Sequence, residues 1–204
     1  MNAPGWRASV VEYIRCEAQP KDKYGHQPRL YALACKIGDG EGIAYDDDVV
    51  FAAAWMHDLG VFLGHRPHDP EALARWDHVP YTTARARELL AEWGFPSEKL
   101  DAVAAAIATH QPHQTPLEIE AILVRDADIL EQLGAVGALR AFVKVGRDTR
   151  YESFSSVLPL LRRVLKDMPP QLHLTSSRLL AAPRVQALRD FLVAIESEAG
   201  KLLF

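Results

Sequence analysis

The sequence predicts an all-α protein, and three observations support this fold class. Hydrophobic residues recur with the three- and four-residue spacing of amphipathic helices through most of the 204 residues, whereas strand-like alternation over five or more residues is hard to find. Capping residues open several of these segments, and glycines or prolines end them. The composition, with 49% hydrophobic and 25% charged residues, is that of a globular protein with a substantial core.

Five helices are expected in the first half of the chain. Pro28 falls in the first turn of the second helix, where its missing N–H costs nothing. Three aspartates at 46–48 stand at the positive end of the third helix, which is apolar all round and is therefore expected to be the central, buried one. A loop rich in proline, glycine and histidine is expected at 64–77. The five helices are expected at about residues 6–18, 27–37, 46–60, 78–93 and 97–110.

Further helices are expected in the second half. Thr115 and Glu118 fit a capping box that opens a helix through residue 131. Gly134 interrupts this pattern, and another helix follows in AVGALRAFVKV. A polar loop is expected at 146–152. The last two helices are expected at about 155–166 and from the end of the linker MPPQLHLT to about 198.

All 204 residues are expected to form one domain, with its core at about 20–145. The C-terminal helices, at about 153–198, have normal periodicity and are expected to pack on the same domain. The longest strictly apolar run covers residues 49–56, far short of a bilayer span. The first residues lack the continuous apolar segment of a secretory signal. The sequence therefore predicts a protein that is neither membrane-spanning nor secreted.

The charge of the chain limits its partners. A net charge of −4 and a pI of about 6.1 show no basic bias of the kind that nucleic-acid polymers and anionic membranes attract, so neither is expected as a partner. A small anionic substrate remains compatible, because one site can be locally positive. Cys16 and Cys35 form no CxxC pair, and we expect both to be reduced in a cytoplasmic protein. A homodimer is compatible with the sequence.

A histidine and an aspartate, His57 and Asp58, stand at the end of the most apolar helix. Imidazole nitrogen and carboxylate oxygen are both ligands of first-row metals. Neighbours on a helix project about 100° apart, so both can reach one site between their directions. Because an unpaired buried carboxylate is costly, a positive group is expected opposite Asp58. In the alternative interpretation, Asp58 caps a neighbouring helix and His57 is a hydrogen-bonded core histidine.

Other residues of metal-ligand type share this apolar context. The stripe of His26 continues through three aliphatic residues, and His110 continues another apolar face. A helix begins at His78, and its N-terminus has the partial positive charge that suits a phosphate. Asp126 and Asp128 lie in the apolar segment ILVRDADILEQLG. Inward-facing ligand types on several helices indicate a metal site in the core of a bundle.

Taken in order, these residues resemble the HD superfamily of metal-dependent phosphohydrolases. The matching segments are KDKYGHQPRLYALA with the first histidine, FAAAWMHDLG with the doublet, and RDADILEQLGAVGALRAF with the last aspartate. The resemblance is closest to small stand-alone bacterial HD hydrolases that act on nucleotides, and it covers about residues 10–195. It includes a tail helix with an Ala-Arg-x-Leu-Ala-x-x-Arg pattern, in which Ser177 replaces the first Ala. The matching tail residues are Arg178, Leu180, Ala181 and Arg184.

The resemblance implies an HD-domain helical bundle with a C-terminal helical extension. It implies a divalent metal, Mn²⁺, Fe²⁺ or Mg²⁺, with room for a second one, and a water that attacks phosphorus in a small phosphorylated substrate, such as a nucleotide. Asp58 or Asp128 would accept a proton from that water, and His78 would assist at the phosphate, with His110 as the weaker candidate. The implied metal ligands are His26, His57, Asp58 and Asp128.

The choice between Asp126 and Asp128 depends on which argument is used. A helical wheel slightly favours Asp126, whereas the family pattern favours Asp128, which we therefore prefer. Asp126 would then have a structural role, such as a pairing with Arg125. The sequence also departs from the family, since Ile129 follows Asp128 where many members have a basic residue, and Gly60 to Phe62 replace the acidic residues of some subfamilies.

Two other functions are compatible with these residues. Some HD proteins hold two irons and activate oxygen, and a non-catalytic binding module could retain a structural metal. His65 and Arg66 could contact substrate anions, but we prefer the interpretation that they belong to an ordinary solvated loop, and His68, His113 and His173 are interpreted as surface residues. The six ligands of the oxygenase alternative would be His26, His57, Asp58, His78, His110 and Asp128.

Overall fold

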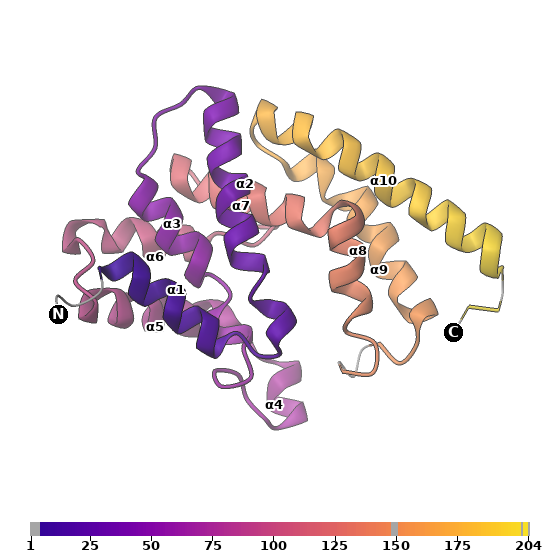
Figure 1. Cartoon of the computed structure of the whole chain (residues 1–204), viewed down its shortest axis with the longest axis horizontal. Coiled ribbons are helices and arrows are strands. Elements are labelled where there is room, and N and C mark those ends of the chain that lie inside the picture. Colours follow the sequence, from indigo (N-terminus) through magenta and orange to yellow (C-terminus); the bar gives the residue numbers. More distant parts are fainter. Residues whose placement is uncertain (1–4, 148–150, 201, 204) are drawn as a thin grey trace. The chain divides into compact units, whose positions relative to one another are not determined.

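The computed structural model describes residues 5–147, 151–200 and 202–203, and these residues form helices and loops without a β-strand (Figure 1). The predicted all-α fold class is confirmed. Short 3₁₀ turns occur at Lys21–Lys23, Leu59–Val61, Ser97–Lys99 and Pro169–Gln171. The α-helices are α1 (Trp6–Glu17), α2 (His26–Glu41), α3 (Asp47–Met56), α4 (Pro70–Ala74), α5 (His78–Glu92), α6 (Leu100–Ala108), α7 (Ile119–Gln132), α8 (Gly134–Phe142), α9 (Phe154–Asp167) and α10 (Thr175–Ala199).

The described chain divides into two compact units, one up to Ala127 and the other from Asp128. In the first unit α3 is the central helix, since it packs against α1, α2 and α6 (Figure 1). Every residue of α3 from Val49 to Met56 is buried, as its unbroken apolar sequence predicts. Complete burial of one large aliphatic or aromatic side chain contributes about 1.5–3 kcal/mol, so α3 anchors this unit.

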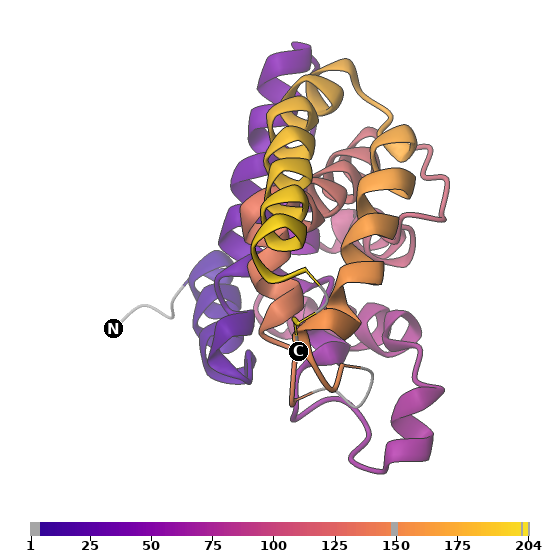
Figure 2. The same ribbon diagram turned by 90° about the vertical axis from the view of Figure 1, so that its right-hand side faces the viewer.

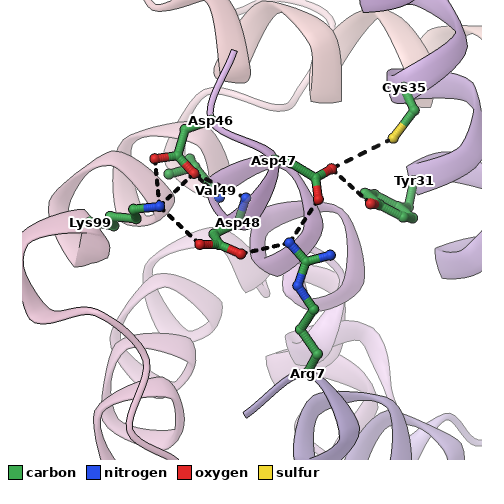
Figure 3. A network of polar contacts seen from close by, with 8 residues as sticks. All are labelled: Arg7, Tyr31, Cys35, Asp46, Asp47, Asp48, Val49 and Lys99. Carbon is green, nitrogen blue, oxygen red and sulfur yellow. Dashed lines mark hydrogen bonds and ion pairs between the residues drawn. The ribbon is translucent and has the colours of Figure 1, made fainter. Parts of the chain in front are cut away.

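The N-terminus of α3 is held by a network of charged groups (Figure 3). Asp46 caps the helix, because its carboxylate accepts the N–H of Asp48 at 3.0 Å. Arg7 of α1 donates to Asp47 and Asp48 at 2.7 and 2.6 Å, and the Lys99 ammonium lies 2.8 and 2.9 Å from carboxylate oxygens of Asp46 and Asp48. The network therefore connects α3 with α1 and with the residue before α6.

The α2 helix is longer than expected and the loop after α3 is more structured. α2 continues through Gly38 to Glu41, and Gly42 ends it with a φ of 69°. A Cβ at Gly38 would lie 2.4 Å from the Tyr45 ring, so close packing explains this glycine. The loop expected at 64–77 contains α4, a five-residue helix that was not predicted.

The second unit contains α8, α9 and α10, which pack against one another. α9 and α10 lie side by side in both views (Figures 1 and 2). Phe142 of α8 contacts the rings of Phe154 and Phe191, with centroids 5.8 and 5.9 Å away. Arg184 of α10 donates to the carbonyl of Leu130 at 2.8 Å and so satisfies an acceptor in the last turn of α7.

Some predicted boundaries are wrong. α7 begins at Ile119, so Thr115 lies before the helix instead of capping it. Part of the polar loop expected at 146–152 lies outside the described residues. The expectation of a single domain over all 204 residues stays a prediction. None of the helices in the described part of the chain has the length and hydropathy needed to cross a membrane.

Candidate metal centre

The His57-Asp58 doublet lies just beyond the end of α3. The helix ends at Met56, and His57 keeps a helical conformation with its N–H bonded to Ala53 at 2.9 Å. Asp58 leaves the helix, with φ −102° and ψ 12°, and begins the 3₁₀ turn that follows. The sequence predicted that the two side chains project from one continuous helix, and this prediction is wrong. The chain changes direction between them.

Three of the sequence-predicted ligands come together at this point. His26 is the first residue of α2, and its Nε2 lies 3.2 Å from Nε2 of His57. Oδ2 of Asp58 lies 3.7 Å from His26 and 3.6 Å from His57. Each of the three residues offers a ligand atom within 4.8 Å of the other two. His26 and His57 are almost completely buried, whereas the Asp58 side chain is 19% exposed.

A second group shares the same aspartate. Nε2 of His78, the first residue of α5, lies 3.7 Å from Oδ1 of Asp58. Asp58, His78 and His110 also offer ligand atoms within 4.8 Å of one another. The two carboxylate oxygens of Asp58 therefore face different histidines, Oδ2 toward His26 and His57 and Oδ1 toward His78.

Two of these histidines are oriented by backbone carbonyls. Nδ1 of His57 lies 3.0 Å from the carbonyl of Ala54, and Nδ1 of His110 lies 2.6 Å from that of Ile107. Because a carbonyl only accepts, Nδ1 bears a hydrogen in both rings, and Nε2 is the nitrogen that can bind a metal. A hydrogen bond on the far nitrogen is the usual support of a metal-binding histidine.

The charge state of Asp58 is set by its neighbours. Burial alone would raise the pKa of this carboxyl, but the charges of His57, His26, His78 and Lys23 outweigh it and hold the pKa well below its ordinary value. Asp58 is therefore ionised at neutral pH. Lys23 lies only three residues before His26, but nothing in the sequence distinguished it as a residue of the site.

The N-terminus of α5 is already capped. The Asp77 carboxylate accepts the N–H of Val79 at 3.0 Å, so a negative side chain occupies the positive end of the helix dipole. That this terminus meets a phosphate stays a prediction. The imidazole of His78 faces Asp58 at this position.

The two candidate aspartates of α7 differ in their surroundings. Asp126 is completely buried beside Arg125, with Oδ1 3.6 Å from Nη1, which is the pairing that the sequence suggested. Arg125 also donates to the carbonyl of Pro112, two residues after His110. Asp128 is 9% exposed and accepts from Gln132 at 3.3 Å. Asp128 begins the second unit, and its assignment as the fourth ligand stays a prediction.

The interpretation of His65 as a solvated residue is wrong. Its side chain is only 7% exposed and bonds to Glu17 and Tyr81. The other three histidines, His68, His113 and His173, are exposed, as predicted. Burial therefore distinguishes the histidines of the cluster from these three exposed ones.

The donor set fits a divalent metal. Imidazole nitrogens and a carboxylate suit Mn²⁺, Fe²⁺ and related ions, and a metal binds the ionised form of the carboxylate and the neutral form of the imidazole. The described residues thus contain a His/Asp centre that could hold a metal.

The comparisons with known proteins agree with this architecture. The HD domain family model matches residues 24–133. A search of the curated proteins found no match.

Several solved structures share the fold. Bacillus subtilis YpgQ in complex with ADP superimposes with a TM-score of 0.71 at 24% identity, covering 97% of this chain and 96% of that chain. An HD-superfamily hydrolase from Bacillus thuringiensis has a TM-score of 0.68 at 19% identity, covering 94% and 95%. A predicted HD-superfamily hydrolase from an uncultured Thermotogales bacterium has a TM-score of 0.62 at 23% identity, covering 95% and 92%. Because the family model matches more than half of the chain, this protein belongs to the HD domain family.

Proposed function

We propose that this enzyme hydrolyses a phosphate bond of a nucleotide, with a divalent metal held by His26, His57, Asp58 and Asp128. The observation that supports this most is the position of Asp58. It is an ionised carboxylate with two nearly buried histidines on one oxygen and His78 on the other. This arrangement offers metal ligands and a proton acceptor in the same place.

The chemistry is divided among the side chains. A divalent metal in such a centre polarises a phosphoryl oxygen and acidifies a bound water. Asp58 is ionised and can accept a proton from water at a carboxylate oxygen. His78 can donate a hydrogen bond to a phosphate oxygen or a proton to the leaving oxygen. His110, whose ring centroid lies 5.5 Å from that of His78, is the second candidate for this role.

The nucleotide substrate is supported by two observations. The similar YpgQ structure contains ADP. Lys23 is a half-buried cation whose charge acts on Asp58, and it supplies a basic group near the site although Ile129 occupies the position after Asp128. We propose that Lys23 contacts a substrate phosphate.

The Lys23 backbone is fixed by a buried neighbour of the site. Gln27 is completely buried, and one terminal atom of its amide lies 2.8 and 3.0 Å from the carbonyls of Lys23 and Tyr24; because carbonyls only accept, we assign this atom as the nitrogen, which donates to both. Since His26 is the residue before Gln27, this clamp fixes Lys23 close to a proposed ligand. The net charge of −4 supports a small anion over a nucleic-acid polymer, and we propose a cytoplasmic location.

The experiment is a metal-dependent substrate screen. The purified protein is stripped with a chelator, supplied with Mn²⁺, Mg²⁺ or Fe²⁺, and incubated with nucleoside mono-, di- and triphosphates. We expect release of phosphate or pyrophosphate from at least one nucleotide and none without metal. No release from any nucleotide with any of these metals would contradict the proposal.

The second histidine group supports one alternative. Asp58, His78 and His110 could hold a second metal, as in the HD proteins that use two irons to activate oxygen. Metal analysis separates the two functions. Two irons per chain with a mixed-valence spectroscopic signal indicate an oxygenase, and one exchangeable Mn²⁺ or Mg²⁺ indicates a hydrolase.

A further inference from the structure

The chain after Asp58 forms an unbroken series of turns. The N–H of Val61 donates to the carbonyl of Asp58 at 3.0 Å, and that of Phe62 donates to Leu59 at 3.2 Å. The N–H of His65 then donates to the carbonyl of Phe62 at 3.0 Å. Each turn is thus bonded to the next, so a displacement of His65 would be transmitted toward Asp58.

The start of α5 and Trp76, two residues before it, hold the near end of this series. Thr82, completely buried, accepts the N–H of Gly60 at 2.9 Å, and the Trp76 indole donates to the Gly60 carbonyl at 2.8 Å. A Cβ at Gly60 would lie 2.9 Å from Cβ of His78. The turn after Asp58 therefore lies directly against the residue that faces the carboxylate.

His65 holds the far end between two helices. Its Nε2 lies 3.1 Å from a carboxylate oxygen of Glu17, at the end of α1, and its Nδ1 lies 2.7 Å from the hydroxyl of Tyr81 in α5. The N–H of Leu63 donates to the carbonyl of Gln19 at 3.3 Å, so the backbone is also fixed here. The turns thus have a second attachment point outside the metal centre.

The side chains of Glu17, His65 and Tyr81 can form one chain of hydrogen bonds in which each donor between them meets an acceptor. A carboxylate only accepts, so Nε2 of His65 donates to Glu17. In the neutral imidazole Nδ1 is then an acceptor, and the Tyr81 hydroxyl donates to it. Hydrogen bonds linked in this way strengthen one another, and the His65 side chain at the centre of the chain is only 7% exposed.

We propose that Glu17, His65 and Tyr81 form a positioning triad that holds Asp58 and His78 at their mutual spacing. Tyr81 lies one helical turn after His78, so the triad fixes both the segment that begins at Asp58 and the helix that begins at His78. The inference rests on the metal centre of the proposed function. It assigns the triad no contact with substrate.

The test compares two tyrosines that both lie beside His65. Tyr81→Phe removes the hydroxyl that bonds to His65. Tyr13→Phe is the matched control, because the Tyr13 ring also lies against His65, with centroids 6.2 Å apart, whereas its hydroxyl bonds to Arg85. Mn²⁺ affinity is measured by calorimetric titration of the metal-free protein. We expect Tyr81→Phe to weaken Mn²⁺ binding by about tenfold, the low end of the effect of losing a supporting hydrogen bond, and Tyr13→Phe to leave it unchanged.

Two substitutions of His65 extend the test. His65→Gln keeps one donor and one acceptor and should retain Mn²⁺ affinity close to that of the wild type. His65→Leu keeps neither and should weaken binding at least as much as Tyr81→Phe. If His65→Leu does not fold, the tyrosine pair decides the question.

The outcomes separate the triad from the proposed function. Equal Mn²⁺ affinity in the wild type and Tyr81→Phe, or an equal loss in Tyr13→Phe, would overturn the triad. A wild-type protein that binds Mn²⁺ but hydrolyses no nucleotide would overturn the proposed substrate and leave the triad standing. A wild-type protein that binds none of Mn²⁺, Mg²⁺ and Fe²⁺ would overturn both.

Discussion

Carboxylates lie at both ends of α3, three at the N-terminal end and one at the C-terminal end, and their partners differ in kind. At the N-terminal end, three partly exposed aspartates are paired with Arg7 and Lys99, which are both charged at neutral pH (Figure 3). At the C-terminal end, Asp58 is less exposed and faces histidines, which can lose their proton and bind a metal. A carboxylate paired with arginine or lysine therefore has a structural role, whereas a carboxylate that faces histidines can take part in metal binding and proton transfer.

The largest effect is expected from matched substitutions at the two ends. Asp58→Ala should abolish nearly all metal-dependent turnover and keep the fold, because α3 retains its apolar packing. Asp48→Ala should keep turnover and lose at most about 1 kcal/mol of unfolding free energy, because its ion pairs are partly exposed. Phosphate-release assays measure the turnover of both variants, and urea unfolding measures their unfolding free energy. Full activity of Asp58→Ala would exclude the metal centre, and its complete unfolding would favour a structural role.

A smaller effect is expected at His78. His78→Ala should lower the turnover rate by about 10²–10⁴-fold, typical of a lost acid–base group, and leave one metal bound per chain. If His78 is instead a ligand of a second iron, the same change should halve the iron content. Metal analysis and turnover of this one variant distinguish the two roles. Unchanged values of both would remove His78 from the site.

Lys23 should affect substrate binding more than chemistry. Lys23→Gln removes the proposed phosphate contact, and the loss of about 1.5 kcal/mol typical of a charged hydrogen bond corresponds to a rise of about tenfold in KM. The value of kcat should change little, since the interaction is the same in ground and transition states. Steady-state kinetics test this, with Lys21→Gln as the neighbouring control because Lys21 is exposed. Equal effects of the two substitutions would contradict a specific role for Lys23.

The smallest effect concerns acid stability at the N-terminal end. Hydrogen bonds from Arg7 and then Lys99 outweigh burial and hold the pKa of Asp48 below its ordinary value of 3.8. A lowered folded-state pKa adds stability above the ordinary value, and this stability is lost as the pH falls below it. Wild type should therefore lose more unfolding free energy than Asp48→Asn between neutral pH and the region below 3.8. Urea midpoints at both pH values check this, and equal losses would show that Asp48 does not contribute.

The sequence predicted regular elements better than their ends. Local periodicity was sufficient to predict α1, α5 and the burial of α3, since each helix is encoded by its own residues. The break after His57 was not predicted, because it depends on packing of Gly60 against α5, 18 or more residues away. The short, capped helix α4 was not predicted, because the segment that contains it is rich in proline, glycine and histidine and so has the composition of a loop.

The same distinction applies to the site. His26, His57 and Asp58 were identified because their residue types are unusual on apolar helical faces. The role of His65 was not, since its partners Glu17 and Tyr81 lie 48 and 16 residues away along the chain. Lys23 was missed because a lysine in a polar loop is ordinary until its neighbour Asp58 is known.

The crowding at Gly60 limits which sequences this fold can accept. Besides the His78 side chain, a Cβ there would lie 2.9 Å from the backbone oxygen of His78 and from Oγ1 of Thr82. Backbone cannot yield as a flexible side chain can, so even alanine would have to move α5 away from Asp58. A library randomised at position 60 and selected for turnover should therefore return mainly glycine. Gly60 has no side chain that could take part in the chemistry, yet its substitution would then be tolerated as poorly as substitution of a metal ligand.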